Sequence, residues 1–193
     1  MISNEGKLIQ ALIENRESEL NISEIARLVK KDYKNTHNIV RRLQKKLVIR
    51  LERFGNAQKV ILNDQMHPLI FEAEYGRREE FLEKKEIAVM YDSLMALSSK
   101  FYVLLVFGSY AKRTNTKHSD IDLMVIVPDK EQDRMESEIH RIVKTIPLKI
   151  QVNVVSESDF VAMKNSRQVT VGSEVIKKNI LLHGVEVYYE LIR

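Results

Sequence analysis

The stretch FYVLLVFGSYAKRTNTKHSDIDLMVIV, residues 101–127, decides the fold of the second half of the chain. An apolar run ends at Gly108-Ser109, a polar loop follows, and Ser119-Asp120-Ile121-Asp122 leads into a second apolar run. This pattern predicts two strands joined by a polar loop. Residues two apart on a strand point to the same face, so Asp120 and Asp122 should share one. Two neighbouring carboxylates repel each other unless a cation lies between them, and oxygen ligands of this kind suit Mg²⁺.

The composition narrows the class of protein. A chain of 193 residues with 44% hydrophobic residues suits one or two globular domains. The absence of cysteine excludes a disulfide framework and thiol chemistry. No apolar run approaches the ~20 residues of a membrane span, and the polar N-terminus is unlike a secretory signal. We therefore expect a cytoplasmic protein with no membrane partner.

The charge is distributed unevenly along the chain. Residues 1–65 carry 13 Lys and Arg against 8 Asp and Glu, whereas residues 66–193 carry 18 against 19. Between residues 27 and 53 there are 10 basic and 2 acidic residues. So basic a segment indicates a polyanionic partner. A solvated lysine-rich surface would show the same composition.

The first 65 residues form a unit of their own. Apolar spacing predicts helices over 6–13, 24–29 and 35–47, with Ser23 as an N-cap. Two short strands over 48–53 and 59–62 should follow, joined by a turn. Three helices and a hairpin are the layout of a winged helix-turn-helix domain.

The segment ISEIARLVKKDYKNTHNIVRRLQKKLVI, residues 22–49, also resembles the winged-helix regulators. The resemblance implies that the helix over 35–47 enters the major groove of double-stranded DNA. Domains of this class commonly read two half-sites, which implies a homodimer. A domain that binds protein, or only dimerises, is the alternative. By this resemblance, bases would be contacted by Asn35, His37, Asn38 and Arg41, and phosphates by Lys34, Arg42, Lys45 and Arg53.

His67-Pro68 closes this unit, because a residue before proline disfavours helix. Residues 69–99 are then expected to be largely helical, with an interruption at Tyr75-Gly76. The predicted domains are a winged helix over 1–65, a helical connector over 66–86 and a second domain over 87–193. Whether the connector is a plain linker or a dimerising helix is left open.

In the second domain, a helix over 131–146, a strand over 148–155 and further helices predict a sheet flanked by helices, of the α+β or α/β class. The motif GSYAKRTNTKHSDIDL, residues 108–123, resembles the signature of the DNA polymerase β-type nucleotidyltransferases. It is most similar to the minimal nucleotidyltransferases, GSxARGxxxxxSDIDL, and the tail IKKNILLHGVEVYY, residues 176–189, is similar too. The resemblance implies an α+β fold with a mixed sheet.

The resemblance also implies a reaction, the transfer of a nucleoside monophosphate from an NTP to a hydroxyl group with Mg²⁺ or Mn²⁺. Asp120 and Asp122 would be the catalytic residues and would hold the metal. Gly108 would let the backbone approach the phosphates. The NTP would be bound by Gly108, Ser109, Lys112, Arg113 and Ser119. For the basic residues of the loop, including Lys117, a solvated surface is an equal alternative.

Two positions depart from the family pattern. Arg113 stands where the family has glycine, and a positive φ is harder for arginine, so the loop is expected to differ. The family's third carboxylate should come from the strand over 148–155, which offers only Gln151 and Asn153. By phase, Asn153 is the expected metal ligand, although an amide supplies no charge. An acid just beyond the strand, Glu157 or Asp159, is the alternative.

Three functions follow from these patterns. The first is an enzyme whose acceptor is a hydroxyl, such as a protein side chain on a toxin-like partner, as implied by the minimal nucleotidyltransferases. The second is a DNA-binding regulator or antitoxin whose nucleotidyltransferase domain is weak or inactive and binds only a nucleotide or a partner. The third is an antitoxin-like binder that uses no nucleotide.

Overall fold

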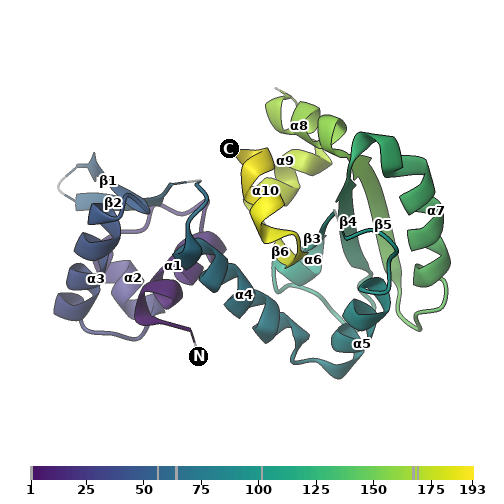
Figure 1. The fold of residues 1–193 in the computed structure, drawn as a ribbon. Coiled ribbons are helices and arrows are strands. Elements are labelled where there is room, and N and C mark those ends of the chain that lie inside the picture. Colours follow the sequence, from purple (N-terminus) through teal and green to yellow (C-terminus); the bar gives the residue numbers. More distant parts are fainter. Residues whose placement is uncertain (1, 56, 64, 101, 167, 169) are drawn as a thin grey trace. The chain divides into compact units, whose positions relative to one another are not determined.

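The computed structural model describes residues 2–55, 57–63, 65–100, 102–166, 168 and 170–193. The chain divides into two compact units, Met1–Gly76 and Arg77–Ile192 (Figure 1). Within the described ranges, no helix combines the length and the apolar character needed to cross a bilayer.

The first unit has the winged helix-turn-helix layout. Helices α1 (Asn4–Glu14), α2 (Ile22–Leu28) and α3 (Tyr33–Lys45) precede an antiparallel hairpin of β1 (Ile49–Phe54) and β2 (Ala57–Leu62), with Ile49 opposite Leu62. One apolar face of each helix points inward, and the resulting core is fully buried. Its members include Leu8, Ile9, Ile25, Val40, Leu43 and Ile49. The predicted fold of this unit is therefore confirmed.

The starts of α2 and α3 differ from the predicted ones. The side chain of Asn21 accepts a hydrogen bond from the backbone N–H of Glu24, and the Glu24 carboxylate accepts one from the N–H of Asn21. This capping box makes Asn21 the cap and places Ser23 inside the helix, so the prediction of Ser23 as N-cap is wrong. Asp32 caps α3, its side chain accepting a hydrogen bond from the backbone N–H of Asn35, and the helix begins two residues earlier than predicted.

Helix α3 ends with a backbone strain that glycine would relieve. The N–H of Val48 donates to the carbonyl of Leu43, and the N–H of Leu47 donates to that of Gln44. These two bonds form a Schellman motif, whose residue after the C-cap takes a left-handed conformation. That residue is Leu47, at φ +59°. Its side chain is 70% exposed, so its packing does not offset the strain.

We expect Leu47→Gly to raise the free energy of unfolding of the first unit by about 0.5–1 kcal/mol. A left-handed conformation costs a non-glycine residue about 1–2 kcal/mol, and the added chain entropy of glycine offsets about half of that. Denaturant unfolding of the full chain measures the change. Lys45→Gly, inside the same helix, is the control and should lower stability by about 1 kcal/mol. A loss of stability in Leu47→Gly would contradict this interpretation.

Helix α4 (Pro68–Leu82) runs without a break through Gly76, so the predicted interruption at Tyr75-Gly76 is wrong. The glycine serves packing, because a Cβ built there would lie 2.8 Å from Cδ1 of Ile2. The division between the two units falls within this helix. The boundaries 1–65, 66–86 and 87–193, including a separate connector, stay a prediction.

The second unit is built on a four-stranded mixed sheet, as predicted. Its strands are β3 (Val103–Phe107), β4 (Ile121–Val127), β5 (Ile150–Ser156) and β6 (Ile180–His183), in the order β5-β4-β3-β6. β4 and β5 are parallel, and the other pairs are antiparallel. The helical elements are α5 (Lys85–Leu94), α6 (Gly108–Ala111), η1 (Asp129–Glu131), α7 (Gln132–Val143), α8 (Glu157–Asn165), α9 (Val171–Lys177) and α10 (Val185–Ile192).

Helices cover both faces of this sheet (Figure 1). Ile121, Leu123 and Val125 of β4 join the core formed with α5 and α7. The alternate residues Met124 and Ile126 are also buried, on the opposite face, where α8 packs on β4 and β5. Asp122 is in phase with Met124 and Ile126. It therefore lies on the α8 face of the sheet, at the beginning of β4.

Candidate functional site

The two acids of the SDIDL motif lie together, as the strand phase predicts. Asp122 is the second residue of β4 and Asp120 lies two residues before it; both are half-buried. Burial, and then the charge of Asp120, raise the pKa of Asp122. The charge of Asp120 therefore opposes the ionisation of Asp122, and a cation bound between the two carboxylates would remove that opposition.

Gly108 reaches this pair because of the strand register. Phe107, the last residue of β3, lies opposite Asp122, so the chain passes the carboxylate as it enters α6. A Cβ built on Gly108 would lie 2.0 Å from Oδ2 of Asp122, and the residue has φ +66°. Only glycine fits both the contact and the backbone angle. The Gly-Ser turn and the second acid of SDIDL thus form one local structure, with Ser109 following in the first turn of α6.

We expect Gly108→Ala to lower the free energy of unfolding by about 3 kcal/mol, of which roughly 1–2 kcal/mol comes from φ and the remainder from displacing Asp122. Gly55→Ala is a matched control, since Gly55 has φ +56° and nothing within 4 Å of its added Cβ. Denaturant unfolding compares the two variants. Adding Asp122→Ala to Gly108→Ala should recover part of the loss. Equal losses in the two single variants would contradict a contact between Gly108 and Asp122.

The loop between α6 and β4 keeps the positive φ despite its arginine. Arg113 has φ +57°, so the expected change of backbone at this position is wrong. The N–H of Thr114 donates to the carbonyl of Ser109 and that of Arg113 to Tyr110, a Schellman motif that closes α6. The motif shows why a glycine suits this position in the pattern GSxARG, and it holds arginine in the same conformation.

Three side chains at this loop, those of Lys112, Arg113 and Ser119, have partners within the second unit. The Nζ of Lys112 lies 3.6 Å from Glu174 of α9, and Arg113 lies 3.3 Å from Glu80 of α4. The hydroxyl of Ser119 accepts a hydrogen bond from the N–H of Thr116. These bonds are exposed and can be exchanged, since surface ion pairs contribute only about 0–1 kcal/mol. Binding of phosphate by Gly108, Ser109, Lys112, Arg113 and Ser119 stays a prediction.

Strand β5 brings an amide to the acid pair. Gln151 lies beside Asp122 in the parallel register, and its Nε2 donates to Oδ2 of Asp120 at 3.2 Å. Asn153 lies two residues further along the strand, beside Met124. The residue of β5 that contacts the acids is thus Gln151, and a metal-binding role for Asn153 stays a prediction. The alternation of β5 placed the amides of Gln151 and Asn153 on one face, but only the register shows which of them lies nearer to the acid pair.

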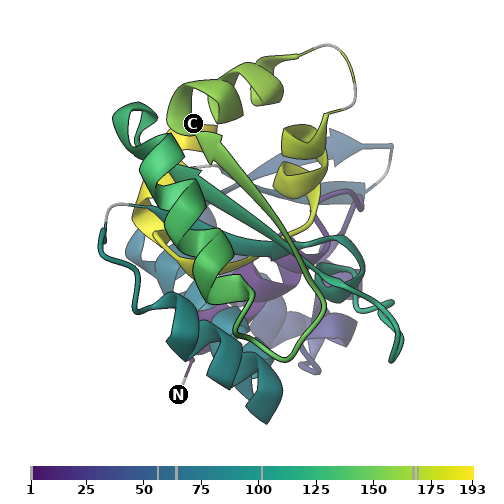
Figure 2. The same ribbon diagram turned by 90° about the vertical axis from the view of Figure 1, so that its right-hand side faces the viewer.

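The acids after β5 lie at the other end of the strand. Ser156, where β5 ends, is five residues beyond Gln151, roughly 16 Å at ~3.3 Å per residue. Figure 2 shows α8 following at that far end. There the N–H of Ser158 donates to Asp129, and the N–H of Asp159 donates to the Ser156 cap. Glu157 and Asp159 therefore do not supply a third carboxylate to the pair, and that alternative is wrong.

The fit to a metal follows from this donor set. Across the described part of the chain, no cluster of three or more His, Asp or Glu side chains could hold an ion. The pair offers two half-buried carboxylates on one strand face, which suit one hard divalent cation completed by substrate oxygens and water. The residues fit one such ion, which Asp120 and Asp122 would hold.

The candidate DNA face lies on α3. Lys34, Asn38, Arg41 and Lys45 recur at helical spacing and are all exposed, so they form one stripe along the helix. The side chains of Asn35 and His37 contact other residues of the first unit. The Asn35 side chain donates to Asp32, and the His37 ring stacks on Tyr33 with centroids 6.0 Å apart. Arg53 is exposed on β1.

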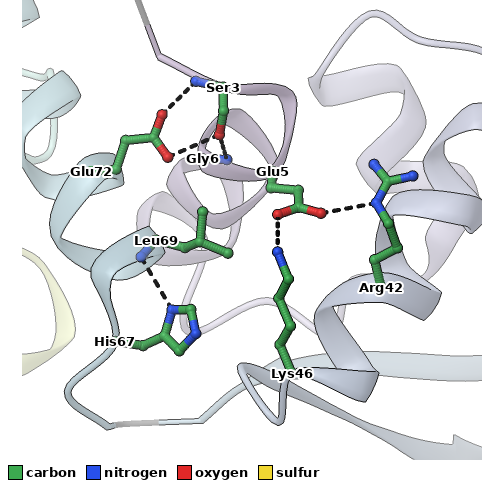
Figure 3. A network of polar contacts seen from close by, with 8 residues as sticks. All are labelled: Ser3, Glu5, Gly6, Arg42, Lys46, His67, Leu69 and Glu72. Carbon is green, nitrogen blue, oxygen red and sulfur yellow. Dashed lines mark hydrogen bonds and ion pairs between the residues drawn. The ribbon is translucent and has the colours of Figure 1, made fainter.

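Arg42 differs from its neighbour Arg41 because it is held by an acid that sequence reasoning missed. Glu5 of α1 accepts from Nε of Arg42 at 2.9 Å and from Nζ of Lys46 at 2.7 Å (Figure 3). Lys46, one turn after Arg42, was missed as well, although this spacing could have found it. The hydrogen bonds from Lys46 and Arg42 hold the pKa of Glu5 below its usual value. The cluster therefore stabilises the folded unit at neutral pH, and this contribution is lost as the pH falls through the lowered pKa.

We expect Glu5→Gln to raise the affinity for duplex DNA about two- to fivefold, since each exposed ion pair it breaks is worth up to about 1 kcal/mol. The substitution releases two cations and removes a negative charge beside α3. Fluorescence anisotropy with a labelled duplex at fixed salt measures the change. Glu14→Gln, which removes the same charge from the other end of α1, is the control. A fall in affinity would show that Glu5 positions Arg42 for DNA.

Fold and site together define a winged helix-turn-helix unit joined to a nucleotidyltransferase-type unit. Residues 92–186 match the family model described as polymerase beta, nucleotidyltransferase, so the second unit contains a domain of this type. Residues 3–65 match a family model described only as HVO_A0114.

The comparisons with individual proteins add little. No curated protein matches the chain. Among solved structures, the chain is similar to MepR, a transcription regulator of the Staphylococcus aureus multidrug efflux pump MepA, at 14% identity and a TM-score of 0.35. The match covers 75% of this chain and 79% of MepR. A TM-score of this size does not define a common fold.

Proposed function

We propose that this chain transfers a nucleoside monophosphate from an NTP to a hydroxyl acceptor, and that its first unit binds double-stranded DNA. The observation that carries the transferase part is the contact of Gly108 with Asp122 beside Asp120. This contact joins the two halves of the nucleotidyltransferase motif in one half-buried site, within the residues that match the family model.

The residues of the chain have separate tasks in this proposal. Asp120 and Asp122 hold Mg²⁺ or Mn²⁺, which when bound offsets negative charge on the triphosphate and the leaving group. The Ser109 hydroxyl and nearby backbone N–H groups bond the phosphate oxygens. Lys112 and Arg113 exchange Glu174 and Glu80 for the triphosphate.

A second candidate function is a DNA-binding regulator, or antitoxin, whose second unit binds a nucleotide but turns it over slowly or not at all. It is favoured by Gln151, an uncharged amide that lies beside the acid pair where a third carboxylate would assist catalysis. An amide cannot act as a base or balance charge. The basic stripe on α3 supports DNA binding in either case.

We also propose partners for the two units. The acceptor is a hydroxyl group, for which we propose a side chain of a toxin-like protein. A homodimer would let two winged helices read two half-sites of one duplex. Since NTPs and DNA are its ligands, we expect the protein to act in the cytoplasm.

Labelled NTP tests the two candidates together. The chain is incubated with each α-labelled NTP, Mg²⁺ or Mn²⁺ and candidate acceptors, and pyrophosphate release and label transfer are followed. Pyrophosphate that depends on Asp120 supports the enzyme. Nucleotide binding by calorimetry without pyrophosphate supports the regulator. If no NTP binds in the presence of metal, both candidates are contradicted, and a binder that uses no nucleotide remains.

A further inference from the structure

We infer that the acid pair holds one divalent ion rather than two, and that Gln151 is the residue that sets this number. The inference rests on the proposed function, since it assumes that the pair binds a metal–NTP complex. It concerns the number of ions that the site binds, and its test does not depend on turnover.

Both neighbouring strands place a residue beside the acid pair. Asp122 is flanked by Phe107 on β3 and by Gln151 on β5. The acids that follow β5 are held at the opposite end of the strand, where Ser158 donates to Asp129. Among the residues that the structure describes, no third acid joins Asp120 and Asp122 in a metal-binding group.

The amide of Gln151 contacts the acid pair. Nε2 of Gln151 donates to Oδ2 of Asp120 at 3.2 Å, so one acceptor position of that carboxylate is occupied. Its interaction with the carboxylate turns the amide nitrogen, which cannot ligate a cation, toward the pair. Gln151 thus orients Asp120 as a positioning residue and contributes no charge.

The charge of the two carboxylates also favours one ion over two. Two divalent ions that share a site are about 3.5–4 Å apart, and their repulsion is four times that of two unit charges at the same distance. Two carboxylates carry half the charge of two such ions, and one of them already accepts from Gln151. A single ion needs only the two carboxylates, with phosphate and water oxygens completing its shell.

A variant with a third acid should therefore gain a second ion. Gln151→Glu keeps the length of the side chain and replaces the donor by a carboxylate, so Asp120 loses its bond and the site gains a negative charge. Asn153→Asp is the matched control. It adds the same charge to the same strand face two residues further along, beside Met124.

Electron paramagnetic resonance of Mn²⁺ bound with a non-hydrolysable NTP tests the inference without any turnover. The unchanged protein should give the six-line spectrum of an isolated ion, as should Asn153→Asp. Gln151→Glu should give the exchange-coupled spectrum of two ions that share a ligand. Gln151→Asp is a second variant, should the first unfold.

The possible results distinguish a failure of this inference from a failure of the proposed function. A coupled spectrum in the unchanged protein, or an isolated-ion spectrum in both folded Gln151 variants, would overturn the inference and leave the proposed function standing. A coupled spectrum in Asn153→Asp would show that position 153 can also set the number of ions, and it would overturn the inference about Gln151 as well. If the protein immobilises no Mn²⁺ with the NTP analogue, the proposed function itself fails.

Discussion

Asp122→Asn is expected to weaken binding of the metal–NTP complex at least about 10²-fold. Removing one of two unit charges near a bound cation loses several kcal/mol even at the dielectric of a protein surface. Pyrophosphate release should fall by at least the same factor. Titration of Mn²⁺ with a non-hydrolysable NTP measures the first effect, and a labelled NTP measures the second.

The same substitution should stabilise the ligand-free protein. Burial and the neighbouring charge of Asp120 raise the pKa of Asp122, so its charged form is disfavoured in the folded state. That penalty is present at neutral pH and disappears as the pH falls through the raised pKa, where the carboxyl is protonated. The midpoint of thermal unfolding should therefore rise at neutral pH in Asp122→Asn, with a smaller gain in acid.

Asp129→Asn is the matched control for this pair of effects. Hydrogen bonds from Ser158 hold the pKa of Asp129 below its usual value, so this substitution should lower stability at neutral pH and leave metal binding unchanged. If Asp122→Asn bound the metal–NTP complex as well as the unchanged protein, Asp122 would not be a metal ligand.

Arg41→Ala is expected to weaken binding of duplex DNA about 5- to 150-fold, because a contact of this kind to a base is worth about 1–3 kcal/mol. Arg41 lies at the centre of the exposed stripe on α3, where its side chain donates a 3.3 Å hydrogen bond to Gln44. Arg42→Ala should have the smaller effect, since Glu5 holds that side chain. Fluorescence anisotropy over a range of salt concentrations measures both.

The salt dependence separates the two kinds of contact. Loss of a phosphate contact lowers the slope of log affinity against log salt by about 0.9, whereas loss of a base contact leaves it nearly unchanged. Arg141→Ala, an exposed arginine on α7, is the control and should change neither quantity. Flat salt dependence in the unchanged protein would contradict a DNA-binding role for the first unit.

The parts of the fold that follow from local periodicity were predictable. Apolar runs around Gly108-Ser109 and SDIDL predicted β3 and β4, and helical spacing predicted α1 and α3. The ends of the helices were less predictable, because more than one polar residue can serve as the cap. Asn21 is the cap of α2 because its side chain and that of Glu24 each accept a hydrogen bond from the backbone N–H of the other residue. Ser23 is only one residue from Glu24 and cannot form this pair of bonds. Likewise, glycine usually interrupts a helix, but Gly76 is kept in α4 by its contact with Ile2.

The candidate site was predictable where it depends on strand phase and not where it depends on register. Phase alone placed Asp120 and Asp122 on one face. The nearness of Gln151, and the remoteness of Glu157, depend on how β5 pairs with β4, which no local pattern reveals. The bond between Glu5 and Arg42 joins residues 37 apart in the sequence and is equally invisible to periodicity.

We propose that Asp120 and Asp122 form a metal-dependent nucleotide site beside Gly108. A crystal of the protein soaked with a non-hydrolysable NTP and Mn²⁺ tests it most directly, through the anomalous signal of the metal. We predict manganese bound to both carboxylates, with the triphosphate along Gly108 and Ser109. Saturating ligand with no manganese at the acid pair, or a nucleotide bound elsewhere on the chain, would contradict the claim.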